Sequence, residues 1–179
     1  SIVTYTGTGS NATVGHGLGS VPTMIIVKSR SNAKDWTIYH TGIGNTKWLE
    51  LNATTGSQTN SNRWNNTSPT SSAFTVATDS SVNANGYTYV AYCFADITGY
   101  SKFGIYKGNG NANGPFIYTG FKPTYFLLKN ATASAGSSGQ HWQIADTVRH
   151  PLNPIDANLI AESNASEGHT WSIKDFLSN

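Results

Sequence analysis

The feature that most constrains this chain is an internal repeat. Seven residues in the first 28 positions recur in the same order 101 positions later. A fixed offset of this kind means that each copy is one structural unit, so the repeat has to be read before any single motif. The matched residues are mostly glycine, proline and neighbours of apolar runs, which predicts a duplicated framework of turns and strands. They are Tyr5, Gly7, Gly9, Gly19, Pro22, Thr23 and Lys28, matched by Tyr106, Gly108, Gly110, Gly120, Pro123, Thr124 and Lys129.

The repeat continues beyond these residues, with an offset that grows through insertions. Trp36 matches Trp142 at an offset of 106, and Glu50 matches Glu162 at an offset of 112. Further along, Trp64 pairs with Trp171. We therefore expect one duplicated β-sandwich domain over residues 1–179, with repeat units 1–100 and 101–179, the second of them incomplete.

The second copy has no counterpart of residues 73–78 and 86–96 of the first copy. Both stretches are rich in apolar and aromatic residues and predict strands. Two explanations stay open: the chain was cut from something longer, or a neighbouring molecule supplies the missing strands. The chain also begins without methionine, from which we expect that it was excised from a longer gene product.

Apolar runs between glycine-rich and asparagine-rich turns predict the fold class. Short strands at near-regular spacing, with almost no helical periodicity, indicate an all-β antiparallel β-sandwich of the jelly-roll or concanavalin type. A short helical turn is expected only within 153–161. Glu50 and Glu162 are expected to face solvent, and the strand at 87–95 to be the best buried. The expected strands are 2–6, 23–28, 36–40, 47–51, 73–78 and 87–95, then 124–129, 142–146 and 158–161.

Charge and cysteine content exclude several classes of function. The chain has 11 basic and 9 acidic residues, and the basic ones are scattered, so we expect no nucleic-acid site. Cys93 is the one cysteine and lies in an apolar strand, where a small buried hydrophobe is expected. No apolar run approaches the ~18 residues of a membrane span, so no membrane insertion is expected. The Ser, Thr, Asn and Gly content suits extracellular or virion β-structure.

A search for catalytic groups finds none. No two carboxylates form the close pair that a glycosidase of this architecture needs. No Gly-x-Ser-x-Gly turn frames a nucleophile, and the five histidines are dispersed rather than set at metal-ligand spacing. We therefore predict a protein that is not an enzyme, with no catalytic residue, no metal and no cofactor.

The candidate binding site lies in the polar segment 54–72, because long loops on compact β-scaffolds are often binding loops. The segment contains Arg63, Trp64, Asn65 and Asn66, and the matching place in the second copy holds His169 and Trp171. Tryptophan faces stack on sugars, while amide, guanidinium and imidazole groups bind hydroxyls, so this set suits a glycan. The alternative is that both tryptophans are core residues, which duplicated positions usually are, and that interpretation stands somewhat ahead.

Three segments carry a resemblance to a known family: 99–129, 82–94 and 175–179. They resemble the duplicated concanavalin/SPRY-like domain of marine bacteriophage virion and tail-fibre proteins, over nearly the whole chain. In that family the second copy continues after Leu-Ser-Asn into a further strand and a run like 86–94, whereas this chain ends there. The resemblance implies a location at the virion surface and provides no catalytic residues.

Together these observations lead to one hypothesis and two rivals. The leading hypothesis is a non-enzymatic phage virion surface module, a tail-fibre or appendage domain that adheres to a host-surface glycan or protein receptor. It would contact other virion proteins and form a homo-oligomer. The first rival is a virion decoration or assembly protein that binds only protein, which the incomplete second copy favours. The second rival is an enzyme that degrades polysaccharide.

Overall fold

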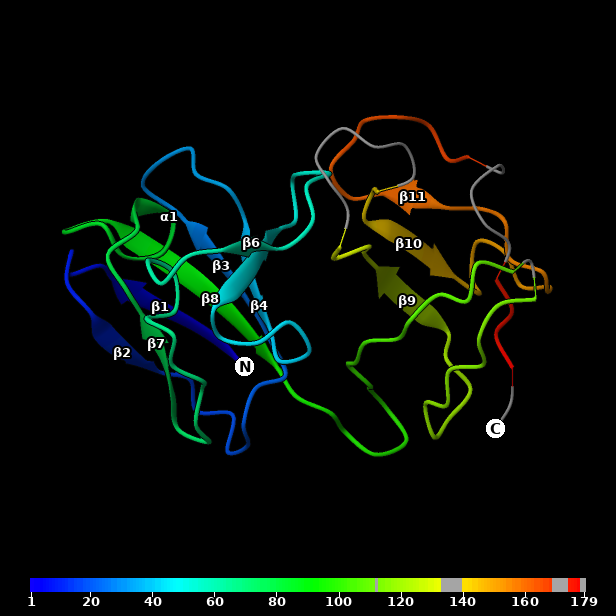
Figure 1. The fold of residues 1–179 in the computed structure, drawn as a ribbon, viewed down its shortest axis with the longest axis horizontal. Helices are drawn as coiled ribbons and strands as arrows, with labels where there is room; N and C mark the ends of the chain where they lie inside the picture. The colour runs from blue at the N-terminus through cyan, green and yellow to red at the C-terminus, as the bar shows by residue number, and fades with distance from the viewer. Residues whose placement is uncertain (112, 133–139, 169–173, 178–179) are drawn as a thin grey trace.

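The computed structural model of the chain describes residues 1–111, 113–132, 140–168 and 174–177. All the strands that it pairs are antiparallel. Among the described residues the only helix is the single turn α1 (Ser80–Asn83), which lies between the strands expected at 73–78 and 87–95. The prediction of an all-β antiparallel sandwich is confirmed (Figure 1).

The largest sheet lies in the first half of the chain and has six strands in the order β1-β8-β3-β4-β5-β6. β8 comes late in this half and inserts between β1 and β3, so that both edges of β3 are hydrogen-bonded. β8 is also paired on both edges, yet β3 is more fully buried than β8, which was expected to be the best-buried strand, because Met24 and Ile26 on the outer face of β3 pack in a cluster with Trp142 of the second half. The six strands are β1 (Ile2–Thr6), β3 (Met24–Ser29), β4 (Thr37–His40), β5 (Lys47–Glu50), β6 (Gln58–Thr59) and β8 (Thr88–Phe94).

A second layer covers one face of this sheet. β2 (Ala12–Gly15) and β7 (Ala73–Val76) pair with each other, and Phe74 of β7 packs in one apolar cluster with Ile25 and Val27 of β3. Residues 25 and 27 share a face because side chains alternate along a strand. The two layers make the sandwich. β2 was not expected, since glycines surround its two apolar residues; it forms because β7 pairs with it.

The second half of the chain forms a smaller sheet of three strands in the order β11-β10-β9 (Figure 1). The strands are β9 (Tyr125–Leu128), β10 (Gln143–Asp146) and β11 (Leu159–Ile160). The helical turn expected within 153–161 does not form; residues 159–160 are extended in β11 instead. A small core lies on one face of this sheet and consists of Phe126, Ala145, Ile155 and Phe176.

The register of β9 and β10 repeats that of β3 and β4. Ile25 lies opposite Tyr39, and the residues that the repeat assigns to them, Phe126 and Ala145, also lie opposite each other. All four paired positions of β9 and β10 correspond in this way, at offsets of 101 and 106. The likeness covers β3–β5 and β9–β11 but not β1, β2, β7 or β8, so duplication of the whole chain stays a prediction.

The third strand of each unit corrects the sequence alignment. Ile38 pairs with Leu49, whereas its counterpart Ile144 pairs with Leu159, which makes the offset 110 and not the 112 read from the sequence. This shift places Glu162 where the first half has Asn52. The hydrogen bonds agree, because the amide of Trp36 donates to Asn52 Oδ1 (2.9 Å) and that of Trp142 to Glu162 Oε2 (3.1 Å).

The expectation that both glutamates face solvent is wrong. The side chain of Glu162 is only 5% exposed and contacts His141 Nδ1 at 2.6 Å. The side chain of Glu50 is 15% exposed and points toward Arg63. In each case a nearby nitrogen group replaces the water that a carboxylate would otherwise bind.

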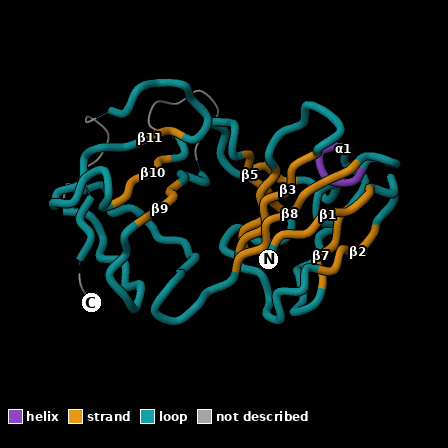
Figure 2. The backbone as a smooth tube through the Cα atoms, turned by 180° about the vertical axis from the view of Figure 1, so that it is seen from behind, coloured by secondary structure: helices purple, strands orange, loops and turns teal. Residues whose placement is uncertain are grey.

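The two halves meet through the outer face of the six-stranded sheet, opposite the β2–β7 layer. Met24, Ile38 and Leu49 of that face form one apolar cluster with Trp142 of the second half, and Leu127 packs at its margin. Trp142 Nε1 also donates to the backbone oxygen of Glu50 at 2.8 Å. Figure 2, seen from behind, shows the second half beside this part of the sheet.

Candidate functional site

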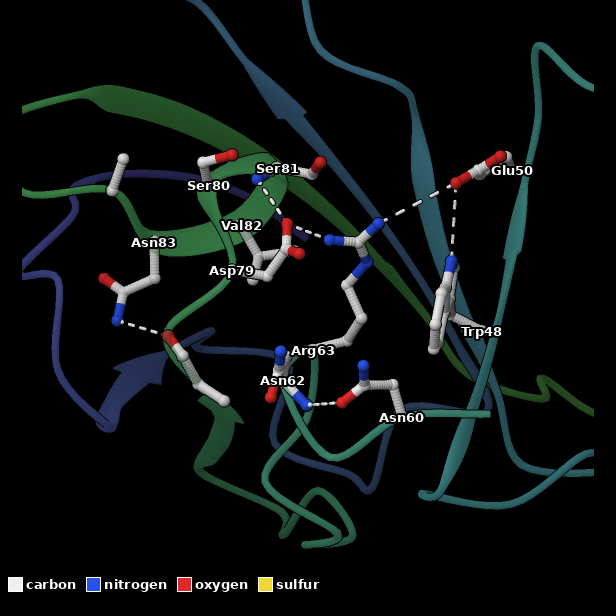
Figure 3. Close-up of polar contacts among 12 residues, drawn as sticks. Trp48, Glu50, Asn60, Asn62, Arg63, Asp79, Ser80, Ser81, Val82 and Asn83 are labelled. Carbon is white, nitrogen blue, oxygen red and sulfur yellow. Dashed lines mark hydrogen bonds and ion pairs between the residues drawn. The ribbon is translucent and has the colours of Figure 1, made fainter. Parts of the chain in front are cut away.

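The Arg63 site is built by three elements of the first half. Arg63 follows β6, its guanidinium lies over the ring of Trp48 in β5 at 4.8 Å, and Nη2 is 3.8 Å from Oε1 of Glu50. Nη1 contacts Oδ1 of Asp79, the residue that caps α1 by accepting a hydrogen bond from Ser81 N at 2.7 Å. Figure 3 shows Arg63 between Asp79 on one side and Glu50 on the other.

Burial makes Arg63 a structural residue. It is 7% exposed, and its burial lowers the pKa of the guanidinium while the carboxylates of Glu50 and Asp35 oppose that change. A guanidinium stays charged in proteins, so its donors are directed at the two carboxylates that flank it. It fastens the loop after β6 to the helix cap and to β5. It has no face turned to a ligand.

Trp64 is also a core residue, with 1% exposure. Its ring packs edge-on against Tyr39, with ring centroids 5.8 Å apart and planes at 80°. A sugar cannot reach either face of this indole. The alternative that the sequence left open therefore holds at this position, and Arg63 and Trp64 are removed from the candidate glycan site.

Asn65 and Asn66 remain at the surface. Both are exposed, and both adopt left-handed backbone angles, with φ of 50° and 49°. Asparagine tolerates this region better than most residues, which explains the residue type without a ligand. Asn65 Oδ1 accepts a hydrogen bond from Asn11 Nδ2 at 3.1 Å. The other two candidates, His169 and Trp171, lie outside the described residues.

A polar recess that the sequence did not predict lies between β1 and β2. Its volume is about 290 Å³, and the hydroxyl-bearing residues Thr4, Thr6 and Thr13 line it. Tyr5 lines it too, but its hydroxyl donates to the backbone oxygen of Val82 at 2.6 Å, and burial raises its pKa. A tyrosine held in this way stays neutral and does not act as a base. Threonines on one face of a strand carry no sequence signal that separates a recess from an ordinary exposed face.

Burial shifts the pKa of further titratable groups of the first half. Burial raises the pKa of the Cys93 thiol to about 11, which keeps it protonated, and its 1% exposure confirms the predicted buried hydrophobe. Burial lowers the pKa of His40. Over the described ranges, no three histidine, cysteine or acidic side chains gather as a metal site would require, and no helix could cross a bilayer.

The second half differs from the first in the apolar surface that it exposes. Of the fifteen large hydrophobic residues that are exposed in the described parts of the chain, five lie in 1–100 and ten in 101–179. Tyr106 is 48% exposed and Tyr125 is 54% exposed. Tyr5, the counterpart of Tyr106 in the repeat, is half-buried and stacks on Tyr89 of β8 at 5.1 Å.

The same region has an open sheet edge. β9 is the outermost strand of its sheet, whereas its counterpart β3 has β8 on the equivalent side. Among the described residues, Figures 1 and 2 show loops and no strand beyond β9. An unpaired edge beside exposed apolar side chains is a surface to which another strand can add. This surface, rather than the Arg63 loop, is the site that the geometry supports.

Comparison with known proteins gives one match. Residues 1–179 match a family model described as a domain of unknown function, DUF7483. No curated protein and no solved structure matches the chain.

Proposed function

The chain belongs to the DUF7483 family, and we propose that it is a non-enzymatic module of a larger surface assembly that works by binding protein. One observation carries the proposal: the second half combines the open edge of β9 with ten of the fifteen exposed large hydrophobic residues. Monomeric proteins rarely leave apolar surface and a free strand edge together, since the pair promotes association.

The setting of this assembly is part of the proposal. The segments 82–94, 99–129 and 175–179 resemble domains of phage virion and tail-fibre proteins. This supports a place in a tail fibre, a capsid decoration or another virion appendage, where a module contacts copies of itself or other virion proteins.

The proposal is tested by light scattering of the purified chain at rising concentration. We expect the mass to rise above the 19.1 kDa of one chain, because the exposed apolar residues of the second half become covered on association. A mass that stays at 19.1 kDa up to millimolar concentration would contradict assembly through this surface.

Adhesion to a host-surface glycan is the second candidate function. It is favoured by the exposed amides of Asn65 and Asn66 beside that of Asn11, which can bind sugar hydroxyls without an aromatic partner. A glycan array decides between the two. Binding that Asn65→Ala and Asn66→Ala both abolish, with the fold intact, would favour adhesion over assembly.

A further inference from the structure

The first half of the chain shows what covers a sheet edge of this kind. Just beyond the two ends of β3, Arg30 N donates to Thr88 O of β8 at 2.8 Å, and Thr41 N donates to Thr23 O on the opposite edge at 2.9 Å. Backbone groups alternate along a strand, so Ile26 is directed toward β8 and Ile25 toward β4. β8 thus occupies the edge to which the backbone of Ile26 points.

β9 has backbone N–H and C=O groups that face away from its neighbour β10. Thr147 N donates to Thr124 O at 2.9 Å, one step beyond the pair of Asp146 with Tyr125. By alternation, Phe126 and Leu128 are directed toward β10, while the N–H and C=O groups of Tyr125 and Leu127 point to the open edge. Leu127 is the counterpart of Ile26, whose groups face β8.

The segment that matches β1 does not form the corresponding strand. In the first half β1 pairs with β8 along its whole length, from Ile2 opposite Tyr92 to Thr6 opposite Thr88. Residues 103–107 match β1 in the repeat but form no strand, and Ile105 within them is 68% exposed. Phe103 packs against Phe94 at the end of β8, with ring centroids 5.8 Å apart, and its amide donates to Asp96 Oδ1 at 3.0 Å.

A pair of matched glycines supports this correspondence. A Cβ on Gly7 would lie 2.2 Å from the backbone oxygen of Ala84 and 3.0 Å from the ring of Tyr89. A Cβ on Gly108, its counterpart in the repeat, would meet nothing within 4 Å. The glycine that makes close approach possible in the first half is thus present in the second half, where the described residues leave open space around it.

We propose that the open edge of β9 is a docking surface for one extended strand with the chemistry of β8, which adds antiparallel to β9. The inference rests on the proposed function and specifies its partner. The register of β3 with β8 gives the pattern, since the small residues Cys93 and Ala91 lie opposite Ile25 and Val27. Their counterparts Phe126 and Leu128 are larger, so the docked strand needs small, uncharged side chains at those two positions.

The test uses the whole 179-residue chain and a synthetic peptide with the sequence of 87–95, carrying Cys93→Ser and two added lysines at each end. Amide hydrogen exchange is followed by NMR, and affinity by calorimetry. On binding, the amides of Tyr125 and Leu127 should exchange at least about tenfold more slowly, because they become hydrogen-bonded. The amides of Phe126 and Leu128 should change little, since they already bond to β10. A peptide with Ala91→Phe should bind less tightly, because its ring would meet Leu128.

A pair of variants at one exposed position separates backbone pairing from side-chain contact. Tyr125→Pro removes an N–H on the open edge and leaves the β10 ladder intact, since proline is tolerated at edges. It should weaken peptide binding by about tenfold, the effect of one lost hydrogen bond. Tyr125→Ala keeps that N–H and should weaken binding less.

The outcomes distinguish this inference from the proposed function. If the chain self-associates but the peptide neither binds nor protects Leu127, the proposed function stands and the β8-type partner is wrong. If the peptide binds and slows exchange at Phe126 rather than Leu127, the edge is misassigned and the inference fails. If the chain stays monomeric and binds no peptide, both fail.

Discussion

The two halves of this protein contain the same three-stranded unit but complete it differently. In the first half, β3 lies between β4 and β8, and three of its residues, Ile25, Val27 and Ser29, are buried on the sandwich side. In the second half, β9 has the same register against β10 but no strand on its other side. A repeated sequence therefore yields a repeated local structure, while closure depends on strands that arrive from far along the chain.

The layer that covers the first half also determines which residues of the candidate site are structural. In the first half β7 and α1 bring Asp79 to Arg63 and enclose Trp64, so the residues that look like a binding site are structural. In the second half the small core of Ala145, Ile155 and Phe176 covers less, and ten large hydrophobic residues of the described ranges stay at the surface, where they can bind.

The largest effect should come from the closed core. Trp64→Ala is expected to lower the free energy of unfolding by about 3–5 kcal/mol, because a fully buried indole leaves a cavity. Phe126→Ala in the half-buried core of β9 should cost less, about 1–2 kcal/mol. Urea unfolding of both variants measures this. Equal losses would mean that the two cores are equally closed.

The matched glycines give the next largest contrast. Gly7→Ala should cost about 3 kcal/mol, since the new methyl group would overlap a backbone oxygen that cannot move without disturbing α1. Gly108→Ala should be neutral or slightly stabilising, because space is open there and alanine restricts the unfolded chain. Thermal unfolding compares the pair, and a loss at Gly108 as large as at Gly7 would show that a partner segment already covers it.

The Arg63 contacts should have an intermediate effect. Arg63→Met keeps an apolar side chain beside Trp48 but removes the guanidinium that lies over its ring and leaves Glu50 and Asp79 without their cation, at an expected cost of about 2 kcal/mol. The figure is below that of a fully buried pair because both carboxylates keep some water contact. Lys102→Met, which removes an exposed pair with Asp96, is the control and should cost at most about 1 kcal/mol. If the two variants lose the same stability, Arg63 is not the link that holds the loop.

The smallest effect should be a pH dependence confined to the second half. Burial lowers the pKa of Lys174 to about 8, where its amine contacts Gln143 Oε1 at 2.6 Å and Asn158 Oδ1 at 3.1 Å. The unfolded chain holds this proton up to about pH 10.4. Between these values the unfolded state binds more protons, so the free energy of unfolding should rise with pH.

The control for this prediction is Lys174→Met, studied by urea unfolding at the same pH values. Burial also raises the pKa of Tyr5, Tyr89 and Tyr125, and their ionisation is common to both proteins. The difference between wild type and variant therefore isolates the lysine. A difference that stays constant from pH 8 to 10 would show that Lys174 is equally solvated in both states.

Local structure could be predicted from the sequence where apolar runs meet turn residues. β3 and β9 follow this pattern, and Pro22 and Pro123 stand shortly before them. Gly19 and Gly120 both adopt left-handed backbone angles in the turns that precede these strands. The strand order could not be predicted. The sequence of β8 does not indicate that this strand inserts between β1 and β3, because its position in the sheet depends on long-range pairing.

The candidate site was the weaker part of the sequence analysis. Arg63 and Trp64 stand in a polar loop, and only the distant residues Glu50, Asp79 and Tyr39 make them buried. The alignment of Glu50 with Glu162 failed for a related reason. The hydrogen bond that the tryptophan amide donates is kept, while the contact of Asp35 with Asn52 in one half is replaced by that of His141 with Glu162 in the other. Exchanged pairs of this kind conserve an interaction but not a residue type.

β9 has an open edge where β3 has a filled one, and amide hydrogen exchange of the chain alone distinguishes the two edges. The measurement is made at low micromolar concentration, where light scattering shows a single chain. We expect slow exchange at Ile26, whose amide bonds to β8, and fast exchange at its counterpart Leu127. Phe126 and Ile25 should both be slow. Equal protection of Leu127 and Ile26 would contradict the open edge and remove the basis for strand addition.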